Sequence, residues 1–403
     1  MAPLTDNLGG VTYIGRAPVF DRRLDVAGFH LIVDQIGRGP TDEPDPIHTR
    51  QVLTRALLEV GLDSLIGART GFVDVTLDML DDGLHHALPG HRVALEINGS
   101  IDSDAIDLLR GVREEGYTLL VGSLLDTANP SEILQVAGGV GVDLGSGALS
   151  EVATLRAQVA PRSKLLVSGL KNSTDVEPCR QVDATWLRGE VLQPTETIDE
   201  PTVPASRTAV LELLAELERP EVGIDDIDRL VSIDLGMSYK ILRMANSSYL
   251  ALERRVERTR DAIVYLGIDT VRAVAALLAL SEATDHPPEI VHLSLVRAKH
   301  CEEIAKATSP HLAHAAFTTG LFSGLDLLLG LSVHQVLDRI PVSDEIAGAL
   351  RDRSGRLGTI LSTVMAYERH DLDALARSSL EPATIVMAYR HALTWVGRIT
   401  RNL

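Results

Sequence analysis

The chain has 403 residues and a formal net charge of −18, with 45% hydrophobic and 23% charged residues. This length exceeds one ordinary hydrophobic core and predicts two domains. The acidic balance argues against a broad electrostatic surface for DNA or RNA, so we expect no nucleic acid partner.

The first residues and the two cysteines indicate the cellular compartment of the protein. Residues 1–10 show neither the basic nor the apolar segment of a signal peptide. The strongest apolar run, Ala273 to Leu280, is short for a membrane span. Cys179 and Cys301 lie far apart, which suits a reducing cytosol and leaves no disulfide framework. We therefore expect a cytoplasmic protein without membrane contact.

The first half alternates short apolar segments with segments whose apolar residues recur at helical spacing. Such repeated units predict parallel strands with helices outside, and their number favours an α/β barrel. The interval from Leu77 to Arg92 has little room for a covering helix, which leaves closure of the barrel open. The predicted strands are residues 29–34, 72–77, 92–98, 117–121, 139–145, 164–169 and 185–192.

At residues 192–206 the strand–helix pattern stops in a stretch of prolines, threonines and acids. Beyond it every segment has helical spacing, which predicts an all-α second domain. We expect a barrel domain at 10–196, a linker at 197–206 and a helical domain at 207–403.

The helical half carries two motifs, in LVSIDLGMSYKILRMANSSYL and RTRDAIVYLG. They resemble the HDOD domain, an all-helical relative of the HD phosphohydrolases. Leu235 stands where that family usually has proline, which is a small departure. The matching residues are Ile241, Leu242, Arg243, Asn246 and Ser247, then Ala262, Ile263, Leu266 and Gly267.

Beside such a domain, the first half resembles a degenerate EAL domain, the barrel of cyclic di-GMP phosphodiesterases. The stretch YIGRAPVFDRRLDVAGFHLIVD is similar to the opening of proteins that join a shortened EAL domain to HDOD. The segment GLFSGLDLLLG, residues 320–330, is also similar to that combined family.

The EAL resemblance implies acids and amides at strand ends that hold two divalent metals. Glu96 and Asp143 are kept at such positions, and Asp74 replaces an asparagine but is still an oxygen ligand. The first glutamate is replaced by His30, and the paired aspartates by Gly122 and Ser123. The other replacements are Gly141, Ser168, Lys171 and Arg188. This loss predicts a chain that is not an enzyme and that holds no metal and no cofactor.

Two interpretations of the remaining barrel charges stay open. Asp74, Glu96 and Asp143 would pair with Lys171 or Arg188 inside the barrel opening. Alternatively, Lys171 and Arg188 hold an anionic group, because an arginine fork suits phosphate or carboxylate oxygens. Under the second interpretation the ligand-binding set comprises His30, Asp74, Glu96, Asp143, Lys171 and Arg188.

The helical half lacks the metal ligands of HD enzymes. The family's His-Asp position falls at Ser323 and Gly324 within Gly320–Gly324. His370-Asp371 lies elsewhere and is expected to be a polar helix end. His311 and His314, three residues apart, are expected to be ordinary histidines, because no third donor lies in register.

Asn246 and Ser247 lie where helix propensity is poor. The simpler interpretation is a helix cap bonded to nearby backbone, and the alternative is contact with a partner.

These features predict a non-catalytic bacterial signalling protein, linked by resemblance to cyclic di-GMP, that acts through unidentified protein partners. A homodimer is left open. The first alternative is a metal-independent nucleotide receptor that uses Lys171 and Arg188. The second is a residual metal-dependent phosphodiesterase that uses Asp74, Glu96 and Asp143.

Overall fold

The chain divides into two compact units, residues 1–197 and 198–403, which are described separately. The computed structural model describes residues 11–36, 61–99, 101, 105–122, 130–144, 163–190, 205–219, 221–246, 256–284, 286–329, 332–338, 340 and 342–400.

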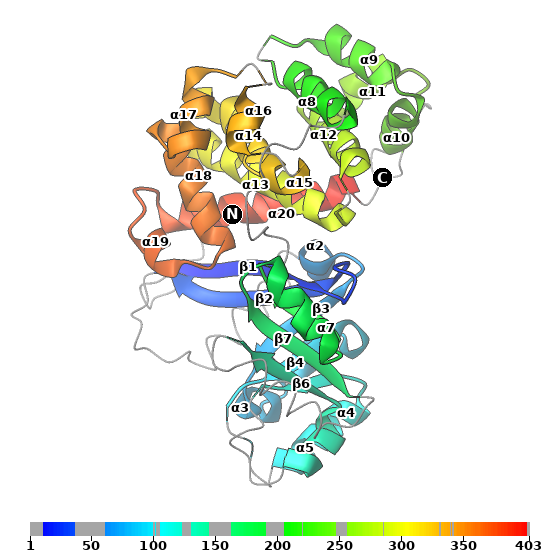
Figure 1. The fold of residues 1–403 in the computed structure, drawn as a ribbon, viewed down its shortest axis with the longest axis vertical. Coiled ribbons are helices and arrows are strands. Elements are labelled where there is room, and N and C mark those ends of the chain that lie inside the picture. Colours follow the sequence, from blue (N-terminus) through cyan, green and yellow to red (C-terminus); the bar gives the residue numbers. More distant parts are fainter. Residues whose placement is uncertain are drawn as a thin grey trace. The chain divides into compact units, whose positions relative to one another are not determined.

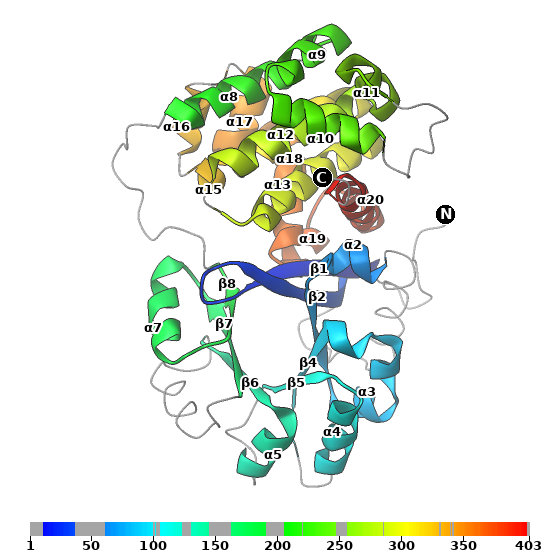
Figure 2. The same ribbon diagram turned by 90° about the vertical axis from the view of Figure 1, so that its right-hand side faces the viewer.

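The first unit is a closed barrel of eight strands (Figures 1 and 2). Strand β1 runs antiparallel to both of its neighbours, β2 and β8, and every other neighbouring pair is parallel. The strands are β1 (Val11–Phe20), β2 (Val26–Ile36), β3 (Thr70–Val75), β4 (Val93–Ile97), β5 (Thr118–Val121), β6 (Gly139–Asp143), β7 (Lys164–Leu170) and β8 (Trp186–Gly189).

The predicted α/β barrel is confirmed, and the seven predicted strands are all present. The sequence prediction missed β1, the strand that closes the barrel. Gly15, Arg16 and Pro18 interrupt its apolar residues, so it shows neither a continuous apolar run nor strict alternation. Closure, which the sequence left open, therefore depends on the one strand without a clear pattern.

Short helices connect the barrel strands. Between β3 and β4 only short elements fit, as the spacing predicted. Helix α4 buries Ile106, Leu109 and Val112, which recur at helical spacing, and it packs against α5 (Figure 2). The described helices of this unit are α2 (Leu62–Ile66), α3 (Leu77–Asp81), η1 (Leu84–Ala87), η2 (Gly90–Arg92), α4 (Ala105–Glu114), α5 (Pro130–Ala137), η3 (Ser173–Asp175) and α7 (Val176–Gln181).

The barrel interior is filled by side chains from several strands. Val19, Phe72, Ala94, Leu120 and Leu166 form a fully buried cluster. Trp186 packs edge-on against Phe72, with ring centroids 5.1 Å apart. This apolar core fixes the strand ends that carry the candidate site.

The second unit is entirely helical in its described part, as predicted. Helix α13 is its centre and packs against α14, α18 and α20 (Figure 1). The helices are α8 (Ala205–Leu217), α9 (Ile224–Ser232), α10 (Leu235–Ala245), α11 (Thr259–Leu266), α12 (Ile268–Ala283), α13 (Pro288–Thr308), η4 (Pro310–Leu312), α14 (Ala313–Phe322), α15 (Leu325–Leu329), α16 (Val333–Leu337), α17 (Asp344–Asp352), α18 (Gly355–Glu368), α19 (Leu372–Ala376) and α20 (Pro382–Thr400).

Among the described residues, Pro310–Leu329 is long and apolar enough to cross a membrane. Within this unit 67% of that window is buried. The pair α11 and α12 passes the same test only together, and the two helices are bent by 115°.

Candidate functional site

The barrel opening at the carboxyl ends of the parallel strands brings together most of the predicted site residues. His30 lies on β2, Asp74 on β3, Glu96 on β4 and Arg188 on β8. Asp74 and Glu96 are register partners on neighbouring strands. His30 and Glu96 are buried, with 9% and 6% of their surface exposed. Four predicted residues therefore share one end of the barrel.

His30 and Asp74 form the first polar pair. The His30 Nε2 atom lies 2.9 Å from Asp74 Oδ2. Burial acts to raise the pKa of Asp74, but the hydrogen bond and charge of His30, with the charge of Arg188, hold that pKa below its usual value. Asp74 is therefore an ionised acceptor at neutral pH.

Glu96 and Arg188 form the second pair. Arg188 Nη1 donates to Glu96 Oε2 at 2.8 Å, and Nη2 donates to Oε1 at 3.2 Å. Their side chains are 18% exposed for Arg188 and 7% for Glu96. This fork is the carboxylate pairing that one interpretation of the sequence predicted. Under the other interpretation, Arg188 would have to release Glu96 before it could hold an anionic group.

The remaining predicted residues lie at the rim or outside the described residues. Asp143 ends β6 and Lys171 follows β7, and both side chains are exposed. Ser123 lies outside the described residues. A Cβ atom at Gly122 would lie 2.9 Å from Asn98 Oδ1, and one at Gly141 would lie 3.0 Å from Glu96 Oε1. Asn98 and Glu96 therefore occupy the space that longer side chains would use.

Three side chains at the barrel opening form a candidate cation site. The ligand atoms of His30, Asp74 and Glu96 lie within 4.8 Å of one another. One nitrogen and two carboxylates suit Mn²⁺ or Zn²⁺ better than an all-oxygen Mg²⁺ site. The set fits a cation in donor chemistry, but Arg188 must first release Glu96.

A second cluster of side chains that could bind a metal ion lies at the opposite end of the barrel. His85 and His86 on η1 each place Nε2 3.4 Å from Glu115 Oε2. Burial is the main cause that lowers the pKa of His85. Because Glu115 precedes β5, this group is remote from the opening where strand-end chemistry is expected.

In the helical unit, the predicted His-Asp position lies against an ion pair. Arg297 of α13 bonds Glu368 of α18, with Nη2 2.7 Å from Oε2, and its Nη1 donates to Ser323 O and Oγ at 3.3 Å. A Cβ atom at Gly320 would lie 2.7 Å from Ala298 Cα, so close packing of α13 and α14 requires glycine there.

Asp371 and Asn246 make the local contacts that the simpler interpretations predict. The Asp371 side chain caps α19 by accepting from Ala374 N at 2.9 Å. Asn246 directly follows α10. Its side chain donates to Val256 O and accepts from Val256 N, both at 2.7 Å. The predicted role of Ser247 lies outside the described residues.

Comparison with known proteins gives a family for the helical unit and relatives for the whole chain. Residues 201–367 match the HDOD domain. The chain is 26% identical over 381 residues to Cyclic di-GMP phosphodiesterase CdgJ of Vibrio cholerae, covering 92% of this chain and 88% of that protein. It is 22% identical to the protein YuxH of Bacillus subtilis, covering 95% and 97%.

Solved structures similar to this chain include EAL domains. An EAL domain protein from Listeria monocytogenes is 14% identical, with a TM-score of 0.35, covering 45% of this chain and 87% of that one. The FimX EAL domain from Pseudomonas aeruginosa, bound to c-di-GMP, is 16% identical, with a TM-score of 0.34, covering 45% and 89%.

The chain thus consists of an α/β barrel unit followed by a helical unit that contains an HDOD domain, as the resemblance in its sequence predicted. The Vibrio cholerae relative is a cyclic di-GMP phosphodiesterase by name.

The prediction that this chain is not an enzyme is wrong by this comparison. The relative that matches 92% of the chain is a phosphodiesterase. The prediction depended on acids missing at single positions such as Gly122. It gave too little weight to His30, which replaces a carboxylate but is itself a metal-ligand type of side chain. In the structure His30 joins Asp74 and Glu96, so three ligand-type residues remain together.

Proposed function

We propose that this chain acts in cytoplasmic cyclic di-GMP signalling by binding cyclic di-GMP at the barrel opening together with one divalent cation. By analogy with its phosphodiesterase relative, we infer that it cleaves a phosphodiester bond there. The observation that carries the proposal is that Glu96 belongs both to the cluster with His30 and Asp74 and to the ion pair with Arg188.

In the proposed exchange, each half of the Glu96–Arg188 pair takes a new partner. Arg188 presents two N–H donors that match two phosphate oxygens. Glu96, once released, joins His30 and Asp74 as a ligand set, and a cation held there would polarise the phosphodiester and activate water. Because neither charge is left unpaired, exchange of both partners together costs less than exchange of one.

The exchange predicts that cyclic di-GMP and Mn²⁺ bind cooperatively. We expect 1 mM Mn²⁺ to tighten cyclic di-GMP binding about tenfold, as typical coupling free energies allow. Calorimetric titration of the full chain with cyclic di-GMP, with and without Mn²⁺, measures this coupling. Chromatography of the same samples detects the linear dinucleotide product.

Glu96→Gln is the decisive variant for this coupling. The substitution removes the carboxylate that holds Arg188, so metal-free binding should become tighter while Mn²⁺ loses its effect. Glu115→Gln, in the group at the other end of the barrel, is the matched control and should behave like the wild type. Equal affinities with and without Mn²⁺ in the wild type would contradict the exchange. Absence of binding in every condition would remove the proposed function.

Contact with a protein partner is a second candidate function, favoured by exposed apolar side chains on the helical unit. Leu235 and Tyr239, one turn apart on α10, are 85% and 64% exposed, and Ile233 just before them is 78% exposed. Val264 and Tyr265 on α11 are 62% and 56% exposed. Exposed apolar groups of this size commonly mark interaction surfaces. We propose a second copy of this chain as the partner, because it presents the same apolar side chains and therefore a surface of matching chemistry.

Sedimentation equilibrium tests this second candidate. We expect a mass above the 43.5 kDa of one chain, and a return to that mass in Leu235→Ser/Tyr239→Ser, because the variant removes apolar contact area. Glu216→Gln on the exposed side of α8 is the control. A single-chain mass for the wild type at every concentration rules out the dimer.

A further inference from the structure

Two histidines and one glutamate meet at the end of the barrel where the parallel strands begin. His85 and His86 belong to η1, which precedes β4, and Glu115 follows α4 and precedes β5. Helix α3, which leads into η1, packs against α4 (Figure 2). The ligand atoms of the three side chains lie within 4.8 Å of one another. The cluster is separate from the barrel opening, so an inference from it does not depend on the function proposed above.

The spacing of the ligand atoms suits a tetrahedral metal ion. His85 Nε2 and His86 Nε2 each lie 3.4 Å from the same atom, Glu115 Oε2. An N–H···O hydrogen bond is typically shorter, about 2.9 Å. With Zn²⁺ bonds of about 2.0–2.1 Å, two ligands of a tetrahedron lie about 3.3–3.4 Å apart, whereas neighbouring ligands of an octahedron lie about 2.9 Å apart. Both distances therefore match a tetrahedral site.

The buried histidine of the cluster is held in place by its neighbours. The His85 side chain is 5% exposed, and the Tyr117 ring packs edge-on against it with ring centroids 5.4 Å apart. The Tyr117 hydroxyl donates to His85 O, and Leu88 O lies 2.8 Å from the same hydroxyl. These contacts fix η1 beside Glu115. Burial lowers the pKa of His85, although Glu115 acts against this, so the ring is in the neutral form that binds a metal.

The other two side chains keep the cluster open to solvent. The side chain of His86 is 65% exposed and that of Glu115 is 46% exposed. A Cβ atom at Gly83 would lie 2.9 Å from His86 Nδ1, and the φ of Gly83 is 74°, so this turn beside the imidazole requires glycine. A metal ion reaches the three ligand atoms from the side of His86 and Glu115, where water is available as a further ligand.

We propose that His85, His86 and Glu115 bind one Zn²⁺ ion, with water as the fourth ligand. Two imidazoles and one carboxylate are donors that zinc prefers, whereas Mg²⁺ and Ca²⁺ prefer oxygen alone. The ion joins η1 to the turn before β5 and so stabilises this end of the barrel. Because the site lies where the strands begin, away from the end that carries catalysis in such barrels, its role is structural.

Zinc binding to the full chain without a histidine tag tests the site. A Glu96→Gln background removes one ligand at the barrel opening, and competition with a chromophoric chelator should then give one bound Zn²⁺ per chain. Adding His86→Ala should weaken this binding at least about a hundredfold, since changes behind the ligands alone cost about 10–100-fold. His91→Ala removes an exposed histidine of η2 and is the matched control. It should bind zinc like the background.

Urea unfolding gives a second readout, with Trp186 as the probe in a Trp395→Phe background. Zn²⁺ should raise the unfolding midpoint of Glu96→Gln, because a ligand of the folded state stabilises it. It should not move the midpoint once His86→Ala is added. If Glu96→Gln fails to fold, His86→Ala alone should lower the zinc content of the wild type by one ion. Absence of zinc binding in the folded background, or equal binding with and without His86, overturns the proposal and leaves cyclic di-GMP binding at the opening untouched.

Discussion

Arg188→Met is expected to destabilise the barrel unit by about 3 kcal/mol, because it leaves a buried carboxylate without its counter-charge. Glu96 is only 7% exposed at its side chain, and Arg188 supplies both of the donors in the fork. Urea unfolding measures the loss. The chain has two tryptophans, so in a Trp395→Phe background Trp186 reports on the barrel unit.

The double variant Glu96→Gln/Arg188→Met distinguishes the cost of an unpaired buried charge from the stability that the whole ion pair contributes. Removing both charges should recover most of the lost stability, since no unpaired ion remains. Arg110→Met is the surface control: its partner Asp107 is largely exposed, so the change should be within about 0.5 kcal/mol. If the single and double variants lose the same stability, packing of the Arg188 stem matters more than its charge.

The same substitution links stability to the proposed function. Arg188→Met removes the proposed phosphate fork, so cyclic di-GMP binding should fall even at temperatures where the variant is folded. In Glu96→Gln, by contrast, both Arg188 donors are kept and no carboxylate holds them, so metal-free binding should become tighter. A variant pair with opposite effects on binding distinguishes a ligand site from a purely structural ion pair.

The strands of the barrel were predictable because most are short apolar runs bounded by glycine or turn residues. β1 was not, because Arg16 and Pro18 break its pattern and its strand conformation depends on β2 and β8 on either side. The pairing of Glu96 with Arg188 was within reach, since both lie at strand ends that meet at one edge. The pairing of His30 with Asp74 could not be predicted, because the two residues are 44 positions apart and only the fold brings them together.

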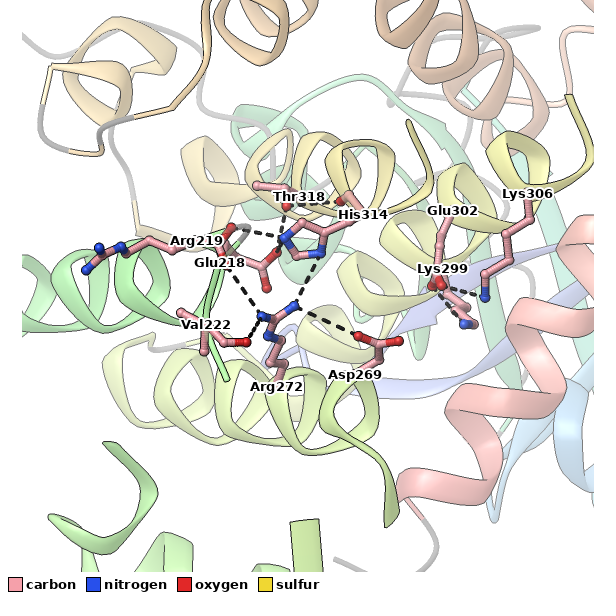
Figure 3. A network of polar contacts seen from close by, with 10 residues as sticks. All are labelled: Glu218, Arg219, Val222, Asp269, Arg272, Lys299, Glu302, Lys306, His314 and Thr318. Carbon is pink, nitrogen blue, oxygen red and sulfur yellow. Dashed lines mark hydrogen bonds and ion pairs between the residues drawn. The ribbon is translucent and has the colours of Figure 1, made fainter. Parts of the chain in front are cut away.

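The polar network around Arg272 and Glu218 in the helical unit could not be predicted in the same way (Figure 3). Arg272 lies in an apolar helix, and its partners Arg219 and Val222 are 53 and 50 residues away. Glu218 is 100 residues from Thr318. Helical periodicity predicts which residues face a core, but it does not indicate which distant helix will meet them. A charged residue at a buried helical position was the one available signal.

The second large effect concerns acid stability, and it depends on His300 of α13. The ring is 1% exposed, its Nε2 donates to Ile385 O at 2.9 Å, and Tyr367 packs edge-on against it. Burial lowers the pKa of His300 to about 4, although its hydrogen bond to Ile385 acts in the opposite direction. The folded unit therefore keeps this histidine neutral through the mildly acidic range.

The unfolded chain binds a proton at His300 near pH 6.5, whereas the folded chain resists it until about pH 4. Hence the free energy of unfolding falls as pH drops from 6.5 to 4, and this histidine alone accounts for about 3 kcal/mol of the fall. Above pH 6.5 it contributes no pH dependence. His300→Gln keeps a side-chain N–H for Ile385 but cannot titrate, so the variant should lose that much less stability on acidification.

Urea unfolding at pH 7, 5.5 and 4, followed by Trp395 in a Trp186→Phe background, measures the difference between wild type and His300→Gln. The comparison is made between slopes, because loss of the ring contact with Tyr367 lowers the variant's stability equally at every pH. His334→Gln on α16 is the control, since that histidine is exposed and should follow the wild-type slope. Parallel slopes for wild type and His300→Gln would mean that His300 gains its proton without opening the core, and that other groups cause the acid sensitivity.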